Sequence, residues 1–257
     1  ATAYSITASD KFCFYQSVEG YNITDLAYGT ASAQAVTLSF WVKSSLTGTF
    51  GGALANDPVN PGWTYPFSYT ISSANTWEKK TITISSNTVN SPGVTNGTGL
   101  AVTYSLGTGS TASGTAGSWQ TAGYISTTGA TSVVGTLNAT WQITGVQLEA
   151  GTVATPFERR SYGQELALCQ RYYTSFQYQT GGTTTSGVGF YGQAFYKQEM
   201  RTTPTLVFSS VGVVGNFDTA VPAVGSISNI REVSFYKTAT ATGSGIYSFT
   251  STCSAEL

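Results

Sequence analysis

Residues 145–173 read GVQLEAGTVATPFERRSYGQELALCQRYY and separate two long regions that are rich in Thr, Ser and Gly. Within this stretch, Ser161 and Gln164 have the S-x-x-Q spacing of a capping box, in which each side chain bonds the backbone N–H of the other residue. We therefore expect a helix of about three turns that begins at Ser161. A helix between two β regions acts as a hinge, an oligomerisation element or a brace.

The expected helix carries one apolar stripe with the period of a coiled coil. Its members follow at spacings of four, three and four: Tyr162, Leu166, Cys169 and Tyr173. Gly163 weakens the first turn by about 1 kcal/mol relative to Ala, and so short a helix is only marginally stable by itself. The stripe must therefore pack, either against the preceding β region or around the axis of an oligomer.

The composition of the chain favours β structure. Of its 257 residues, 9% are charged and 13% are aromatic, whereas about 25% charged residues are typical of soluble domains. No apolar run approaches the roughly 20 residues that cross a bilayer, so we expect no membrane insertion. A net charge of −1 without a Lys/Arg cluster argues against nucleic-acid binding. The polar surface must come from Thr, Ser, Asn, Gln and Gly, as in extracellular or virion proteins.

Residues 1–157 show the two-residue alternation of short strands. In residues 35–43 one face is apolar (Val36, Leu38, Phe40, Val42) and the other is mixed (Thr37, Ser39, Trp41, Lys43). Residues 65–71 alternate in the same way, with Tyr65, Phe67, Tyr69 and Ile71 on one face. Further strands are expected at 77–84, 100–106 and 140–148, with connectors rich in Gly and Asn between them. This pattern predicts an antiparallel sandwich of the jelly-roll kind.

Strand patterns return after the helix, at 175–179, 187–197, 205–208, 230–237 and 245–250. About 80 residues suffice for a second, smaller sandwich. The expected fold is therefore all-β, with two antiparallel β-sandwich domains of jelly-roll type joined by one short α-helix. We place the first domain at 1–157, the connecting helix at 158–174 and the second domain at 175–257.

The residue types leave little room for catalysis. The chain has no histidine, which excludes Ser-His-Asp and Cys-His catalysis and every His-containing metal centre. Its 12 carboxylates show no spacing that singles out a pair for glycoside hydrolysis. Three of them, Glu149, Glu158 and Glu165, lie near arginines in the sequence, so ion pairing is the simpler interpretation. We expect a protein that is not an enzyme.

No cofactor is expected. Cys13, Cys169 and Cys253 lie far apart without a CxxC pair, which argues against zinc. They are interpreted as buried small hydrophobic residues, with a single long-range disulfide as the alternative. A structural Ca²⁺ bound by Asp10, Glu19 or Glu149 with backbone carbonyls stays open, since hard cations take oxygen ligands.

Aromatic residues in loops are the better candidates for ligand contact. Trp63 lies in NPGWTYP with Asp57 and Tyr65 nearby, and Trp119 and Tyr124 follow a glycine-rich loop. Exposed rings beside Asn, Asp and Gln can stack on sugar faces and bond hydroxyls, so these five residues are the candidate glycan contacts. The alternative is that the tryptophans plug the end of a sandwich or a subunit contact.

Several motifs resemble a family of proteins from tailed bacteriophages. QLEAG (147–151), ATPFERR (154–160), ELALCQRYY (165–173) and MRTTPT (200–205) resemble a segment shared by many tail fibres and similar virion proteins. Further similar stretches are VTLSFWVKSSLTGTF (36–50), NTWEKKTITI (75–84) and WQITGVQLE (141–149), so the resemblance spans nearly the whole chain. It implies a carbohydrate-binding-module-like sandwich, a helix and a small terminal β domain, usually in a trimeric appendage.

Two functions follow from this resemblance. The first is a receptor-binding appendage of the virion that binds host-surface polysaccharide or lipopolysaccharide without catalysis. The second is a purely structural role as a capsid decoration or head-fibre protein, and a polysaccharide-degrading tailspike is a minor third. In each case we expect a homotrimer that contacts other virion proteins, is assembled in the host cytoplasm and is exposed on the particle. The stripe of Tyr162, Leu166, Cys169 and Tyr173 is the expected oligomerisation surface.

Overall fold

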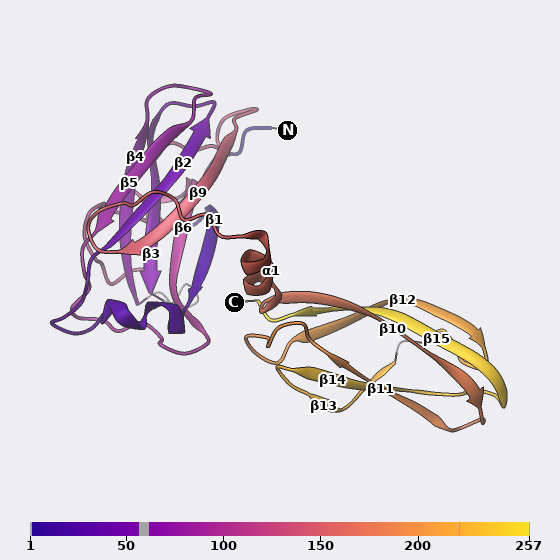
Figure 1. Cartoon of the computed structure of the whole chain (residues 1–257). Coiled ribbons are helices and arrows are strands. Elements are labelled where there is room, and N and C mark those ends of the chain that lie inside the picture. Colours follow the sequence, from indigo (N-terminus) through magenta and orange to yellow (C-terminus); the bar gives the residue numbers. More distant parts are fainter. Residues whose placement is uncertain (1, 57–61, 221, 257) are drawn as a thin grey trace. The chain divides into compact units, whose positions relative to one another are not determined.

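The computed structural model of the chain describes residues 2–56, 62–220 and 222–256 and is drawn in Figure 1. The chain forms two compact units, one ending at Glu158 and the other spanning Arg159–Glu256. We predicted the helix as a separate segment at 158–174, whereas the structure groups it with the second unit. The fold is all-β with antiparallel sandwiches and one short α-helix, and this expectation is confirmed.

The first unit contains a four-stranded and a three-stranded sheet. The four-stranded sheet has the order β1-β6-β3-β4, formed by β1 (Lys11–Glu19), β6 (Thr98–Thr108), β3 (Gly48–Asn56) and β4 (Trp63–Ile71). The three-stranded sheet has the order β5-β2-β9, formed by β5 (Glu78–Ile84), β2 (Val36–Ser44) and β9 (Trp141–Ala150). The short elements η1 (Gly20–Leu26), η2 (Ser110–Ala112), β7 (Ser113–Gly114) and β8 (Ser126–Thr127) complete the unit, with β7 and β8 in parallel.

The core of the first unit lies between these sheets and uses the apolar faces that the alternation predicted. Phe40 of β2 makes edge-to-face ring contacts with Tyr69 of β4 at 5.1 Å and with Tyr104 of β6 at 5.2 Å. Burying aromatic side chains of this size contributes most of the stability of such a core. The same cluster holds the other apolar members of the two alternating runs: Val36, Leu38, Val42, Tyr65, Phe67 and Ile71.

The second unit begins with α1 (Tyr162–Gln170) and continues with two three-stranded sheets. One has the order β10-β15-β12, formed by β10 (Tyr173–Thr184), β15 (Gly243–Ser254) and β12 (Thr205–Gly215). The other has the order β11-β14-β13, formed by β11 (Gly189–Phe195), β14 (Glu232–Thr238) and β13 (Ala223–Ser228). Rings from both sheets meet in the core, where Phe235 lies 4.8 Å from Phe249 and 4.4 Å from Tyr178.

One buried cation braces the second unit. Lys237 of β14 is buried, and its Nζ donates to the Asp218 carboxylate and, at 2.8 Å, to the Ala220 carbonyl. The Tyr247 hydroxyl donates to the same carbonyl at 2.7 Å. The hydrogen bond from Lys237 holds the pKa of Asp218 below its usual range, and burial raises the pKa of Tyr247 to about 12. The ammonium group is therefore paired, as a buried charge must be.

The cysteines differ from the expectation of three buried thiols. All three are free, with Cys253 buried, Cys13 half-buried and Cys169 exposed. Cys169 lies on α1, which buries none of its residues, so its thiol is open to solvent in the single chain. The long-range disulfide does not form.

Candidate functional site

The QLEAG–ATPFERR motif forms a clamp on the outer face of β9. Gln147 and Glu149 face away from the core and bind the segment that leaves the strand. Glu149 accepts hydrogen bonds from the backbone N–H of Thr155 at 3.1 Å and from its hydroxyl. Gln147 donates to the Thr155 hydroxyl at 3.1 Å and accepts from the N–H of Glu158 at 2.8 Å. The motif therefore fixes the exit of the chain from the first unit.

The segment after β9 also reaches β2 and β5 of the same sheet. Thr37 donates to the Gly151 carbonyl at 2.8 Å, and Thr83 donates to the Thr152 carbonyl at 3.4 Å. Thr37 and Ser39 lie on the mixed face of β2, and both are buried. A sheet face can thus be buried without facing the core when a later segment is hydrogen-bonded across it.

The clamp holds Glu149 as a carboxylate. The hydroxyl of Thr155, the side chain of Gln147 and the N–H of Thr155 all hydrogen-bond it, and they keep its pKa below the usual range. Hydrogen bonds to the charged form favour ionisation. Glu149 was also a candidate calcium ligand, and its oxygens are bonded to Thr155 here.

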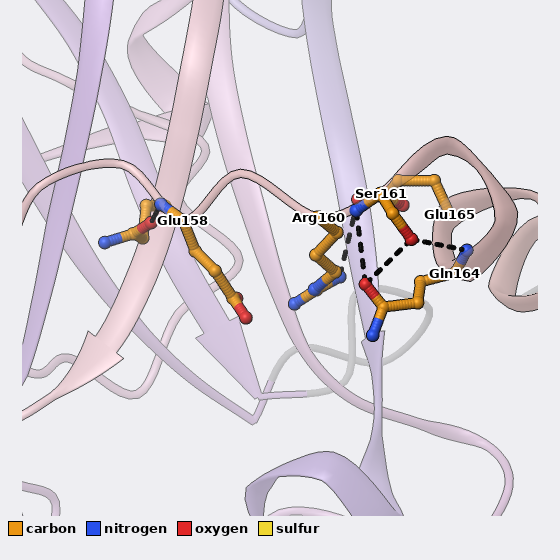
Figure 2. Close-up of polar contacts among 6 residues, drawn as sticks. Glu158, Arg160, Ser161, Gln164 and Glu165 are labelled. Carbon is orange, nitrogen blue, oxygen red and sulfur yellow. Dashed lines mark hydrogen bonds and ion pairs between the residues drawn. The ribbon is translucent and has the colours of Figure 1, made fainter.

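Helix α1 begins at the predicted capping box (Figure 2). The Ser161 hydroxyl accepts from the Gln164 N–H at 3.4 Å, and the Ser161 N–H donates to the Gln164 side chain at 3.1 Å. Arg160 lies 3.6 Å from Glu165, an exposed ion pair in the first turn. The capping box is confirmed, and it satisfies two donors that the helix terminus leaves open.

The other end of α1 is tied to the second unit. The backbone N–H of Arg201 donates to the Arg171 carbonyl at 2.8 Å, and the N–H of Ala255 donates to the Tyr172 carbonyl at 2.7 Å. The guanidinium of Arg201 also donates to the Ala255 carbonyl at 2.9 Å. The MRTTPT motif therefore contributes the arginine that joins the helix, β10 and the C-terminal strand.

Although both ends of α1 are fixed, none of its residues is buried within the chain. The fractional exposure is 81% for Tyr162, 40% for Leu166 and 51% for Tyr173, and Cys169 is also exposed. All four residues of the expected oligomerisation stripe are thus exposed, but only Tyr162, Leu166 and Cys169 lie on α1, because the helix ends at Gln170 and Tyr173 begins β10.

Two of the five candidate glycan contacts pack inside the first unit. Tyr65 is only 6% exposed, and its ring lies edge-on to Trp119 at 5.6 Å. Trp119 is half-buried, touches the Tyr28 ring at 5.8 Å and donates from its indole N–H to the Ser85 carbonyl at 2.7 Å. The glycan assignment is therefore wrong for Tyr65, which is a core residue, and Trp119 packs against the core as the alternative interpretation held.

Two of the remaining candidates, Trp63 and Tyr124, are half-buried. Trp63 starts β4, where its N–H donates to the Asn56 side chain at 2.9 Å, and its side chain is half-buried. Tyr124 is half-buried with its ring over Gly114, where a Cβ would come within 2.4 Å of the ring. Asp57 lies outside the described residues. Trp63 and Tyr124 stay candidates for ligand contact.

A group of exposed rings on the β11-β14-β13 sheet was not among the predicted ligand contacts. Tyr191 and Phe195 of β11 and Tyr236 of β14 are exposed, and Tyr191 pairs directly across the strands with Tyr236. Alternation in GFYGQAF (189–195) already places Tyr191, Gln193 and Phe195 on one face. Only the packing of this sheet against the β10-β15-β12 sheet decides which of its two faces is exposed.

Across the residues that the structure describes, no group of three or more His, Cys, Asp or Glu side chains could hold a metal ion. Within the same ranges, no helix has the length and apolar character to cross a membrane.

Comparison with known proteins gives little guidance. No family model matches the chain, and no curated protein matches it. Two solved structures of discoidin II from Dictyostelium discoideum are similar over 87% of this chain. The wild-type structure is 11% identical to this chain with a TM-score of 0.24, and 72% of its own length is covered. The recombinant native structure is 9% identical with a TM-score of 0.21, and 73% of its own length is covered. Such low scores transfer neither a ligand nor a site.

Proposed function

We propose that this chain is a structural protein of a bacteriophage particle, a tail-fibre-like appendage that forms a homotrimer and binds host-surface polysaccharide or lipopolysaccharide without catalysis. The observation that carries the proposal is α1, a capped helix with fixed ends and no buried residue. Its sequence belongs to the segment that resembles phage tail fibres.

Self-association would bury the apolar side chains of α1 that the single chain leaves exposed. Tyr162 and Leu166 lie four residues apart, so they share one face of the helix. Moving a side chain of this size out of water contributes about 1.5–3 kcal/mol. In a threefold arrangement each copy supplies the same stripe, and the closed symmetry satisfies all three. A monomer would keep these side chains in water with no gain.

The β10-β15-β12 sheet supports the same arrangement. None of its three strands contains a charged residue. Its outward side chains include Tyr173, Val207, Val214 and Ile246, each exposed. A neutral face does not repel a second copy of itself, and charged residues are depleted from the centres of subunit interfaces. Tyr173, the first residue of β10, belongs to this face and was also a member of the expected stripe.

Self-association is tested by measuring the mass of the protein in solution. We expect the wild type to have the mass of a trimer and Leu166→Glu to have that of a monomer, because three carboxylates would meet on the axis. Glu165→Gln, one residue away on the same helix, is the control and keeps the trimer. A wild-type monomer at micromolar concentration would contradict the assembly.

The place on the particle is tested by immunogold labelling of virions with antibody against the chain. Label at the tail tip supports the receptor-binding appendage. Label spread over the capsid shell supports the alternative of a capsid decoration or head-fibre protein. Release of reducing ends from host polysaccharide by the purified trimer would instead support the tailspike.

A further inference from the structure

We propose that the exposed face of the β11-β14-β13 sheet binds a neutral glycan, by stacking of sugar rings on Tyr191, Tyr236 and Phe195. These three residues are called the aromatic platform below. The inference deepens the proposed glycan binding and rests on it. It moves the site from the loops of the first unit to the second unit.

The platform is built by strand pairing. Tyr191 of β11 lies directly opposite Tyr236 of β14, and their rings stack at 5.8 Å with an interplanar angle of 30°. Tyr191 is 78% exposed and Tyr236 39%. Stacking on a cross-strand neighbour limits the freedom of each ring, so a ligand that binds this pair meets side chains that are already oriented.

Phe195 extends the platform along β11. It lies four residues after Tyr191 on the same face, which at 3.3 Å per residue is about 13 Å along the strand. Its ring is 70% exposed and faces Glu232 across the sheet. Because most of this ring stays exposed, folding removes little of its apolar surface from water. The distance between Tyr191 and Phe195 suits a short oligosaccharide rather than a single sugar.

Polar groups lie between the rings. Gln193 stands between Tyr191 and Phe195 on the outer face and donates to the Glu232 carboxylate at 2.6 Å. A carboxylate has acceptor capacity for about four hydrogen bonds, so Glu232 retains capacity for sugar hydroxyls. The platform thus alternates aromatic rings with a hydrogen-bonding amide and carboxylate. A sugar has apolar C–H faces that can stack on the rings and hydroxyl groups at its edges that can bond the polar groups.

The core beneath β11 keeps the platform in place. The inward Gly192 has the Phe235 ring so close that a Cβ would lie 2.3 Å from it, and the Tyr178 ring 2.7 Å away. Only a glycine lets these rings approach the strand. Tyr191 and Gln193 on either side of Gly192 are therefore held outward over a packed aromatic layer.

The two outer faces of the second unit differ in chemistry, and this difference selects the occupant. The β10-β15-β12 face carries no charged side chain and combines exposed Val207, Val214 and Ile246 with uncharged polar side chains such as Gln177 and Gln179, which suits a second copy. The platform instead combines rings with the Glu232 carboxylate. The carboxylate would repel an acidic sugar and, in a contact between copies, would lie near its own equivalent. A neutral glycan avoids both costs.

The test is binding of the full chain to a printed array of neutral and acidic glycans, followed by titration of the best neutral oligosaccharide. We expect Tyr191→Ala/Tyr236→Ala to bind about tenfold or more weakly, as for loss of aromatic hot spots. Tyr191→Phe keeps the ring and retains most of the affinity. Tyr21→Ala removes an exposed tyrosine of the first unit and is the matched control.

The outcomes separate this inference from the proposed function. If the wild type binds glycan and the double variant binds equally well, the platform is wrong and glycan binding stands. If the wild type binds no glycan on the array, the proposed glycan binding fails and the platform fails with it. A double variant that loses the trimer mass would assign the platform to subunit contact and overturn the inference.

Discussion

The side-chain oxygen of Gln147 accepts a hydrogen bond from the backbone N–H of Glu158 at 2.8 Å. This one contact joins the QLEAG motif to the ATPFERR motif, eleven residues later. Because Glu158 is the last residue of the first unit, the bond holds the point at which the chain leaves the sandwich. The two motifs that identify the segment are thus two halves of one clamp.

Gln147→Ala is expected to loosen this exit. It removes bonds to Thr155, Pro156 and Glu158 and lowers the free energy of unfolding of the first unit by about 1 kcal/mol. Trypsin should cleave faster at the exposed Arg159 and Arg160. Gln142→Ala, an exposed glutamine on the same strand, is the control and should leave both the denaturation midpoint and the cleavage rate unchanged.

Acid is expected to weaken the clamp through Glu149. Its folded pKa is lowered, chiefly by the Thr155 hydroxyl, so its contribution is present above the unfolded pKa of about 4.3 and is lost as the pH falls through the folded pKa. Urea midpoints at pH 5 and pH 3 test this. The wild type should lose more stability than Glu149→Gln, and equal losses would remove Glu149 from the acid response.

The Lys237 brace predicts an order of stabilities. Asp218→Asn leaves a buried ammonium with only neutral acceptors and should lower the denaturation midpoint of the second unit. Lys237→Met removes the charge and keeps the volume, so it should cost less. Chemical denaturation of both variants gives the comparison. A larger loss for Lys237→Met would mean that the cation itself stabilises the fold.

Substitutions at Gly163 and Ser161 should change the stability of helix α1 in opposite directions. Gly163 has open space where a Cβ would be added, so Gly163→Ala should stabilise the helix by about 0.5–1 kcal/mol. Ser161→Ala removes the cap and should cost about 1 kcal/mol. Thermal unfolding of the assembled protein measures both. If both variants shift the unfolding temperature in the same direction, helix α1 does not limit the thermal stability of the assembled protein.

Cys169 offers a direct check of the trimer. If the stripe lines an axis, copies of this exposed thiol approach one another, and a mild oxidant should yield covalent dimers on a denaturing gel. Cys169→Ser should abolish them, while Cys253→Ser, at a buried thiol, should not. Trimer mass in solution without any cross-link would place the axis away from Cys169.

Much of this fold is readable from the sequence because it depends on local rules. The alternation of Val36, Leu38, Phe40 and Val42 has period two, and all four are buried. Ser161 and Gln164 are three residues apart, so the capping box needs no distant partner. Patterns of this kind act over a few residues and survive in any tertiary context.

The errors share one physical cause. Alternation assigns residues to two faces but does not say what covers each face. Thr37 was placed on the mixed face of its strand, and it is buried there with its hydroxyl donating to the Gly151 carbonyl. Tyr65 was named a candidate glycan contact although it shares its strand face with Phe67, and it is a core residue. The pairing of Tyr191 with Tyr236 joins residues 45 positions apart, which no local pattern relates.

The sequence by itself determined the all-β class, the apolar faces of the main strands, the helix with its cap and the lack of histidine chemistry. Only the tertiary structure decided that α1 stays uncovered, that the QLEAG motif is a clamp, and that the aromatic platform faces outward. Local propensity and side-chain chemistry belong to single residues and short spacings. Burial and contact belong to pairs of segments, and these are defined only when the sheets assemble.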